Sequence, residues 1–439
     1  MASLAELLQE AGVVGAGGAG FPAHVKAQAH VDYVIANGAE CEPLIHKDLE
    51  IMIHHAGEVV EGLRLMMEAT GAPRGIIGLK KKNQAAVDAF SAACRDPRMS
   101  IHQLGDFYPS GDEYILVYEA TGRLIPPQGI PLAVGVVVNN VETLFNVARA
   151  ARGRPVTEKF ITVAGAVRKP ATFMVPVGMR YRDAIALAGG TTLESTSVFV
   201  GGLMMGRLVA DLDAPITKTC AGLIVLPTQH TLVQRMSQPA SVMHRIGKSA
   251  CDQCTFCTEL CPRYLLGYDV QPHKVMRSLG FTKTGEDFWS QYAALCCACG
   301  LCTLYACPEN LFPKEACDSA KDRMKQAGVR WSGPTEVQPH GMYTGRRTPL
   351  KLLMKKLGVL EYDVPSRFVD RAAQPAAVRL PLQQHVGQPA TPVVSVGATV
   401  ESGDLVGEIP SGALGARVHA TIAGVVREVS DAIVIEAKP

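Results

Sequence analysis

The sequence lacks three features that would assign it to a membrane, to nucleic acid or to the secretory route. No apolar run approaches the roughly 18 residues that a membrane helix needs, so we expect no membrane span. The 43 Lys and Arg residues nearly balance the 41 Asp and Glu residues, which leaves no excess charge for a nucleic-acid partner. The first residues lack a charged segment followed by a long apolar stretch, so we expect no secretory signal.

Length and cysteine content set the number of domains and the redox setting. A chain of 439 residues is too long for one core and predicts about three or four domains. Eight of the 13 cysteines fall into two closely spaced runs whose metal chemistry needs a reducing, intracellular setting. The remaining cysteines are expected to be buried, inert thiols, and they are Cys41, Cys94, Cys220, Cys317 and one of the Cys296/Cys297 pair.

The first cysteine run has the spacing C-x2-C-x2-C-x3-C-P, which is typical of bacterial ferredoxins. This spacing wraps the backbone around one face of a [4Fe–4S] cube, and the proline turns the chain away. The second run has four residues rather than three before its last cysteine, and Cys297 is an alternative ligand to Cys296. In two-cluster ferredoxins the fourth cysteine ligates the other cluster, so we expect the runs to interlock. The predicted ligands are Cys251, Cys254, Cys257, Cys261, Cys296, Cys299, Cys302 and Cys307.

Zinc is the alternative metal, because paired C-x2-C motifs also make zinc sites with four thiolate ligands. Zinc sites usually stop at two cysteines per knuckle. Each run here has a third cysteine at the same spacing and ends in Cys-Pro. The pattern therefore favours two [4Fe–4S] clusters.

Residues 1–154 predict an α/β domain, because apolar strand-like runs alternate with helical stretches. The expected strands are Tyr33–Ala36, Gly75–Leu79, Ile115–Tyr118 and Gly135–Val138, and the expected helices include Leu44–Ala69 and Gln84–Cys94. The glycine-rich stretch Gly15–Pro22 has few Cβ atoms, so its backbone amides can approach a phosphate or a flat cofactor. Lys26 follows closely enough to meet the same anion.

The rest of the chain divides into four further segments. Residues 155–235 predict a small β-rich domain, with a hairpin at Phe160–Val177 and a helix at Tyr181–Leu187. Residues 236–328 carry the cysteine runs among helices, and residues 329–365 are a linker with a basic helix at Leu350–Leu357. Residues 366–439 are β-rich and resemble the barrel-sandwich hybrid of biotinyl and lipoyl carriers. A carrier needs a lysine at its hairpin tip, but the only lysine of this segment is Lys438, so we interpret it as a structural module.

Four motifs, Gly17–Pro22, Asn37–Pro43, Tyr108–Glu113 and Asn139–Leu144, resemble the flavin- and NADH-binding subunit of respiratory complex I. They look still closer to the C-type component of the Rnf electron-transport complex (RnfC). With the two cysteine runs and the C-terminal sandwich, the order of segments is most similar to the cobalamin reductases of propanediol-utilising bacterial microcompartments. The resemblance implies a multidomain α/β and α+β protein. Its expected parts are a Rossmann-like FMN/NADH domain, a soluble-ligand-binding β-grasp (SLBB) domain, a helical ferredoxin-like dicluster domain and a barrel-sandwich hybrid.

The resemblance also implies an FMN site and an NADH site in the N-terminal domain. The residues that would contact FMN through its phosphate, its ring or the pocket wall are Gly17, Gly18, Gly20, Lys26, Asn37, Glu40, Asn139, Asn140 and Thr143. The residues that would face the nicotinamide nucleotide are Phe21 and Glu113.

The function that follows is electron transfer from NADH through FMN and two [4Fe–4S] clusters to a one-electron acceptor. The resemblance indicates cobalamin as acceptor and a cytoplasmic location inside or at the shell of a microcompartment, with a partner enzyme or a shell protein as candidate partners. No D-x-H-x-x-G cobalamin motif occurs, so a corrinoid would dock transiently or on a partner. The alternatives are an Rnf-type component that exchanges electrons between ferredoxin and NAD, and a non-enzymatic electron relay.

Overall fold

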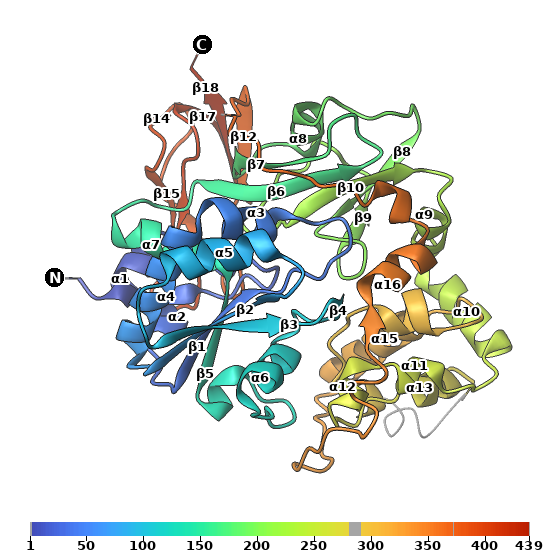
Figure 1. The fold of residues 1–439 in the computed structure, drawn as a ribbon. Coiled ribbons are helices and arrows are strands. Elements are labelled where there is room, and N and C mark those ends of the chain that lie inside the picture. The colour runs from blue at the N-terminus through green and yellow to red at the C-terminus, as the bar shows by residue number, and fades with distance from the viewer. Residues whose placement is uncertain (1, 281–290, 372, 439) are drawn as a thin grey trace.

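The computed structural model describes residues 2–280, 291–371 and 373–438, so residues 281–290 of the expected cluster domain lie outside it. Figure 1 shows four parts: the N-terminal domain in blue and cyan, a green five-stranded sheet, a helical part with the cysteine runs, and a C-terminal β part in orange and red. The expected multidomain fold that combines α/β and α+β parts is confirmed. Among the described helices, none is long and apolar enough to cross a membrane.

The N-terminal domain is built on a parallel sheet with the strand order β3-β2-β1-β5. Successive residues of β1 point to opposite faces, so Val34 packs with α4 and α7 while Ile35 packs with α6. The strands are β1 (Tyr33–Gly38), β2 (Arg74–Lys80), β3 (Met99–Leu104) and β5 (Val136–Asn140). The helices are α1 (Leu4–Glu10), α2 (Ala23–Ala27), α3 (Lys47–His54), α4 (Ala56–Thr70), α5 (Gln84–Ala93), α6 (Glu113–Thr121), the 3-10 turn η1 (Pro131–Val134) and α7 (Val141–Ala151).

One expected strand of this domain is wrong, because Ile115–Tyr118 lies inside helix α6. Asp112 begins this helix, and its carboxylate accepts hydrogen bonds from the backbone amides of Tyr114 and Ile115. The run is apolar on several sides because α6 packs between two hydrophobic clusters. Such a run has no periodicity that could separate a strand from a helix.

The other expected elements of the domain are close to the structure. The remaining three strands coincide with β1, β2 and β5, and the expected helix at Gln84–Cys94 coincides with α5. The long helix expected at Leu44–Ala69 is two helices, α3 and α4, which meet at His55.

The second part is a five-stranded sheet with the order β7-β6-β10-β8-β9, against which α8 packs its apolar face. The expected hairpin is the antiparallel pair β6 and β7, and the expected helix is α8. The elements are β6 (Glu158–Gly165), β7 (Ala171–Pro176), α8 (Tyr181–Leu187), β8 (Thr196–Val200), β9 (Arg207–Val209) and β10 (Gly222–Pro227).

The cysteine runs lie among short helices, followed by the linker helix α16. The basic residues of α16 are exposed, while Leu350, Leu353 and Leu357 fill a core cluster shared with the first three parts. The elements are α9 (Thr231–Met236), α10 (Ala240–Ala250), α11 (Phe256–Glu259), α12 (Pro262–Leu265), α13 (Pro272–Ser278), η2 (Gln291–Ala293), η3 (Cys302–Ala306), α15 (Pro313–Gln326), α16 (Leu350–Leu357) and η4 (Leu360–Tyr362). A short pair, β4 (Phe107–Tyr108) and β11 (Thr348–Pro349), joins the linker to the N-terminal domain.

The C-terminal part consists of two small sheets that face one core. Their strand orders are β12-β18-β17-β14 and β13-β15-β16. Its strands are β12 (Ala377–Pro381), β13 (Thr391–Pro392), β14 (Thr399–Val400), β15 (Leu405–Glu408), β16 (Val418–His419), β17 (Gly424–Val429) and β18 (Ala432–Ala437).

A buried carboxylate joins the first two parts. Glu142 of α7 is 1% exposed, and it pairs with Lys47 of α3 at 2.9 Å and with Lys159 of β6. Its other oxygen accepts a hydrogen bond from the amide of Phe160 at 3.0 Å. Burial alone would raise the pKa of Glu142, but the ammonium groups of Lys159 and Lys47 hold it below its ordinary value. The two parts are therefore docked through an ionised, fully hydrogen-bonded group.

Replacing Glu142 with alanine should lower the free energy of unfolding by about 3–5 kcal/mol, because the buried Lys159 ammonium loses its carboxylate partner and the buried Lys47 ammonium keeps only Asp48. Urea unfolding of the full chain, followed by far-ultraviolet circular dichroism, measures this. The control Glu68→Ala removes the exposed ion pair with Arg64 and should cost no more than about 1 kcal/mol. Equal losses in the two variants would contradict the assigned role of Glu142.

Candidate functional site

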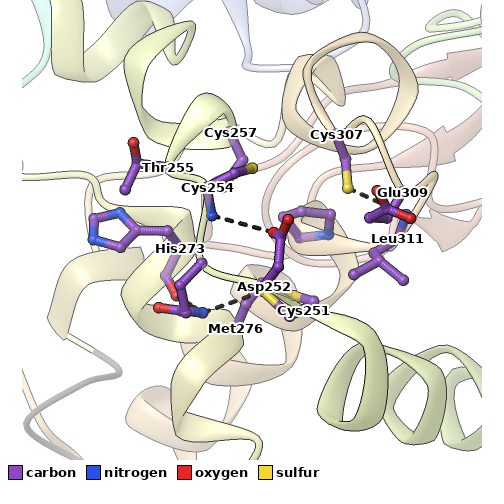
Figure 2. Close-up of a pocket in the computed structure, with 12 residues that line it drawn as sticks. Cys251, Asp252, Cys254, Thr255, Cys257, His273, Met276, Cys307, Glu309 and Leu311 are labelled. Carbon is purple, nitrogen blue, oxygen red and sulfur yellow. Dashed lines mark hydrogen bonds between the residues drawn. The ribbon is translucent and has the colours of Figure 1, made fainter.

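Three cysteines of the first run share a cavity with the last cysteine of the second run. Cys251, Cys254, Cys257 and Cys307 line a cavity that is partly open to solvent (Figure 2). The first run reaches this wall because Gln253 and Thr255 take left-handed backbone conformations, with φ of 62° and 71°. The amide of Leu311 donates a hydrogen bond to the Cys307 sulfur at 3.3 Å. Four thiols on one cavity, with an amide donor to sulfur, fit a [4Fe–4S] cube.

The remaining predicted ligands gather on the other side of the first run. Cys261 is buried, and burial together with the neighbouring Cys296 and Cys297 thiols raises its pKa. Burial, Cys296, Cys257 and Cys261 likewise raise the pKa of Cys302. The arrangement agrees with the interlocked pairing, in which Cys261 joins the second run.

The backbone distinguishes Cys296 from its neighbour Cys297. Ala298 and Gly300 have φ of 55° and 79°, and they stand where Gln253 and Thr255 stand in the first run. This correspondence places Cys296 where the first run has Cys251. The amide of Ala298 donates a hydrogen bond to the Cys296 sulfur at 3.3 Å. We therefore propose Cys296 as the ligand.

The groups that neighbour Cys296 and Cys297 also support Cys296 as the ligand. A hydrogen bond from the buried Cys317 thiol of α15 lowers the pKa of Cys296 to about 7. Cys297 instead contacts the guanidinium of Arg263 and the thiol of Cys299.

The predicted flavin residues lie at the carboxyl ends of β1 and β5. The chain order reverses between these two neighbouring strands, and open α/β sheets bind ligands at such a reversal. The glycine-rich loop lies against this edge, since the amide of Ala16 donates to the Thr143 hydroxyl at 2.9 Å. Gly18 has φ of 112°, and a Cβ there would meet no atom of the described residues within 4 Å, so the loop leaves open space above it. Gly20 is covered instead, by Thr219 and His385 of other parts.

Two groups at this edge have the chemistry that a flavin phosphate and ring require. The side-chain amide nitrogen of Asn139 is buried and has no hydrogen-bond partner within the described residues. The Lys26 ammonium donates to the carbonyl of Val138 at 2.7 Å. Burial lowers the pKa of Lys26, and the nearby Glu113 carboxylate opposes this shift. A buried donor without a partner next to a desolvated cation fits an anionic, hydrogen-bonding cofactor.

The other predicted flavin residues are bonded within the protein. Asn37 donates to the carbonyl of Gly111 at 2.9 Å, and Thr143 accepts from the amide of Ala16 at 2.9 Å. Asn140 accepts from the amide of Glu142 at 3.0 Å and so begins α7.

Glu40 accepts from the first amides of α3 at Asp48 and Leu49, at 2.6 and 3.0 Å. Burial and the nearby Asp48 raise the pKa of Glu40 to about 8. Asn37, Glu40, Asn140 and Thr143 are thus bonded within the protein, and their contact with flavin stays a prediction.

On the nicotinamide side, Glu113 is exposed and Phe21 is partly exposed. Their contact with NADH likewise stays a prediction.

Two contacts that no sequence pattern indicates join the two redox sites. The hydroxyl of Tyr108 donates to the carbonyl of Cys299 at 2.6 Å, and Asp112 pairs with Arg263 at 2.8 Å. Tyr108 and Asp112 lie within the motif Tyr108–Glu113, and this motif was the one sequence feature that could have pointed to these two residues. Their partners lie more than 150 positions away and carry no local pattern.

Four domain families match successive stretches of the chain. They are the Nuo51 FMN-binding domain at residues 8–149, the SLBB domain at 160–208, the 4Fe-4S dicluster domain at 250–312 and the RnfC barrel-sandwich hybrid domain at 365–438. The FMN-binding and dicluster domains imply FMN and two [4Fe–4S] clusters. Fold and matches together define a flavin and iron–sulfur electron-transfer protein.

Similar curated proteins show which family of flavin and iron–sulfur proteins the chain belongs to. The chain is 42% identical over 427 residues to the cobalamin reductase PduS of Salmonella typhimurium, covering 97% of this chain and 94% of that one. It is 41% identical over 432 residues to cobalamin reductase PduS of Citrobacter freundii, covering 98% and 95%. The C-type component of the proton-translocating ferredoxin:NAD(+) oxidoreductase complex of Clostridium ljungdahlii is 34% identical over 266 residues, covering 59% and 55%. The chain belongs to the RnfC- and Nuo51-like family and is a homologue of the PduS cobalamin reductases over nearly its whole length.

The interlocked pairing predicts which substitutions share a phenotype. Cys254→Ser and Cys307→Ser should remove one cluster signal in electron paramagnetic resonance (EPR), whereas Cys261→Ser and Cys296→Ser should remove the other. Each variant should keep about four of the roughly eight irons of an anaerobic preparation. Cys297→Ser is the control and should keep both signals. If Cys307→Ser and Cys296→Ser instead removed the same signal, the pairing would be wrong; stoichiometric zinc without iron would exclude the clusters.

Replacing Asn139 with alanine should weaken FMN binding about fivefold, the effect of roughly 1 kcal/mol for one lost hydrogen bond. Stability of the flavin-free protein should hardly change, since this amide nitrogen has no partner in the described structure. Thr143→Ala is the contrast, because it removes a hydrogen bond to Ala16 and should lower the thermal midpoint of the flavin-free protein. Flavin fluorescence titration and thermal unfolding give the two readouts. A large stability loss in Asn139→Ala would make its role structural.

Proposed function

We propose that the protein is an NADH-dependent reductase that passes electrons through FMN and two [4Fe–4S] clusters to cobalamin. The observation that carries the proposal is the direct contact between the flavin-binding domain and the second cysteine run. There Tyr108, which is 2% exposed, donates to the carbonyl of Cys299 at 2.6 Å. A donor site and an acceptor site that share a hydrogen bond across a domain boundary are arranged for electron transfer between them.

The protein's own groups bind and orient the cofactors. When bound, FMN supplies the conversion of a hydride into single electrons and the clusters supply one-electron carriage. The open backbone at Gly18 and the Lys26 ammonium hold the phosphate, while the Asn139 amide orients the ring. Phe21 and Glu113, at the accessible rim, receive the nicotinamide nucleotide.

Apolar side chains exclude water from the boundary between the two sites. Tyr108, Leu44, Leu301 and Cys299 belong to one buried cluster. A dry boundary limits the loss of electrons to dissolved oxidants and strengthens the local electrostatic interactions.

Cobalamin as acceptor is supported by the two cobalamin reductases that resemble this chain over nearly its whole length. The cavity at Cys251, Cys254, Cys257 and Cys307 is partly open to solvent, which suits an outgoing site. We propose transient docking, since the sequence has no D-x-H-x-x-G motif. The resemblance to microcompartment reductases further supports a place inside or at the shell of a microcompartment.

The similarity to the C-type component of a ferredoxin:NAD(+) oxidoreductase complex supports a second candidate function. In that function the same cofactors would exchange electrons between ferredoxin and NAD. The two functions share the donor side and differ only in the acceptor.

Anaerobic stopped-flow spectroscopy of the holoprotein, with NADH and cob(III)alamin, tests the proposal. Glu113→Ala should slow flavin bleaching by NADH about tenfold, which corresponds to ~1.4 kcal/mol of lost transition-state binding. Cys299→Ser should leave bleaching nearly intact and impair cob(II)alamin formation. Glu428→Ala, at a surface ion pair of the C-terminal part, is the control and should change neither step.

The outcomes separate the candidate functions. Bleaching without corrinoid reduction, while ferredoxin still accepts electrons, would favour the second candidate. If NADH never bleaches the flavin, both candidate functions fail and the non-enzymatic electron relay remains.

A further inference from the structure

Arg263 lies between the flavin-binding domain and the second set of cluster ligands. It follows Cys261 by two positions, in helix α12, and is 8% exposed. Its guanidinium pairs with Asp112 at 2.8 Å and lies over the Tyr114 ring, 3.4 Å from the ring centroid. Both of these partners belong to the start of α6 in the flavin-binding domain. One side of the guanidinium is therefore fixed to the electron-donor domain.

The same guanidinium faces the cysteines on its other side. It contacts the thiol of Cys297, which in turn contacts Cys299. Its Nε is buried and has no hydrogen-bond partner within the described part of the chain. A buried guanidinium N–H without a partner, next to Cys297 and close in sequence to Cys261, has the chemistry to meet an anionic cluster.

The charge of Arg263 is permanent. A guanidinium keeps its proton in proteins, and the buried ion pair with Asp112 favours the charged form. The first cysteine set has different surroundings, since Asp252 and Glu309 line its cavity and Arg235 near Cys307 bonds the carbonyls of Thr303 and Asn310. The two cluster sites therefore differ in their fixed charges.

We propose that Arg263 is a positioning residue that fixes the cluster of Cys261, Cys296, Cys299 and Cys302 against the flavin-binding domain and raises the reduction potential of that cluster. The inference deepens the proposed function and rests on its assignment of this cluster. Reduction adds one electron, and hence one negative charge, to a [4Fe–4S] cluster. A buried cation beside it stabilises the reduced form, and the Asp112 carboxylate partly cancels this effect.

Removing the charge of Arg263 and removing the charge of Asp112 must then shift the reduction potential of this cluster in opposite directions. Arg263→Gln should lower the midpoint potential of this one cluster, and Asp112→Asn should raise it. Asparagine keeps a side-chain oxygen for the start of α6, so the helix retains its cap. Arg263→Lys keeps the charge and should restore most of the shift, although lysine lacks the planar fork that pairs with a carboxylate.

The experiment is an EPR-monitored redox titration of the full holoprotein with dithionite and mediator dyes, without NADH or corrinoid. The relevant signal is the one that Cys299→Ser abolishes. The other signal should keep its midpoint in all variants. Arg180→Gln, at an exposed ion pair with Asp183, is the matched control and should shift neither signal.

Unchanged midpoints in Arg263→Gln, with about eight irons retained, would overturn the proposal. Shifts of the same sign in Arg263→Gln and Asp112→Asn, or equal shifts of both signals, would also overturn it, because loss of packing rather than of charge would then be the cause. If Arg263→Gln loses the cluster, Asp112→Asn and Arg263→Lys decide the question. The titration involves neither NADH nor cobalamin, so failure of the proposed donor or acceptor leaves its result intact.

Discussion

The structure depends on one buried carboxylate, that of Glu142. It lies where α7 leaves the sheet, and it is satisfied only when Lys47, Lys159 and the amide of Phe160 are all in place. Because an unpaired buried carboxylate is strongly unfavourable, the flavin-binding domain and the β-grasp domain cannot separate without cost. The Lys159 ammonium also donates to the carbonyl of Ala16, in the glycine-rich loop. The interaction that docks the two domains therefore also supports the cofactor loop.

The β-grasp domain also contacts both the flavin-binding domain and the second cysteine run. Glu42 of the flavin-binding domain accepts hydrogen bonds from the amides of Met204 and Met205, at 3.0 and 2.9 Å. The same loop reaches the second cysteine run, where a Cβ on Gly300 would lie only 2.7 Å from the carbonyl oxygen of Met204. One loop thus touches both the donor and the acceptor domain. The loop therefore fixes the geometry between these two domains.

Sequence reasoning succeeded where a pattern is local and failed where a contact is distant. The C-x2-C-x2-C spacing predicts that the backbone wraps around one site, and Cys251, Cys254 and Cys257 do line one cavity. The strands at β1, β2 and β5 follow from apolar runs. The strand expected at Ile115–Tyr118 is a helix because its surroundings, which no local pattern encodes, are apolar on several sides. The bonds from Tyr108 to Cys299 and from Lys159 to Glu142 join different domains, so no spacing could predict them.

The unequal spacing of the two cysteine runs has a physical explanation in the same terms. The first run reaches Cys261 through an ordinary turn, in which the amide of Leu260 bonds the carbonyl of Phe256. The second run has one residue more, and its amide at Cys307 bonds the carbonyl of Cys302, five residues back, in a wide π-helical turn. The wide turn absorbs the extra residue, so that Cys307 still reaches the cavity of the first run. A spacing that departs from the ferredoxin pattern is therefore compatible with the interlocked pairing of the two runs.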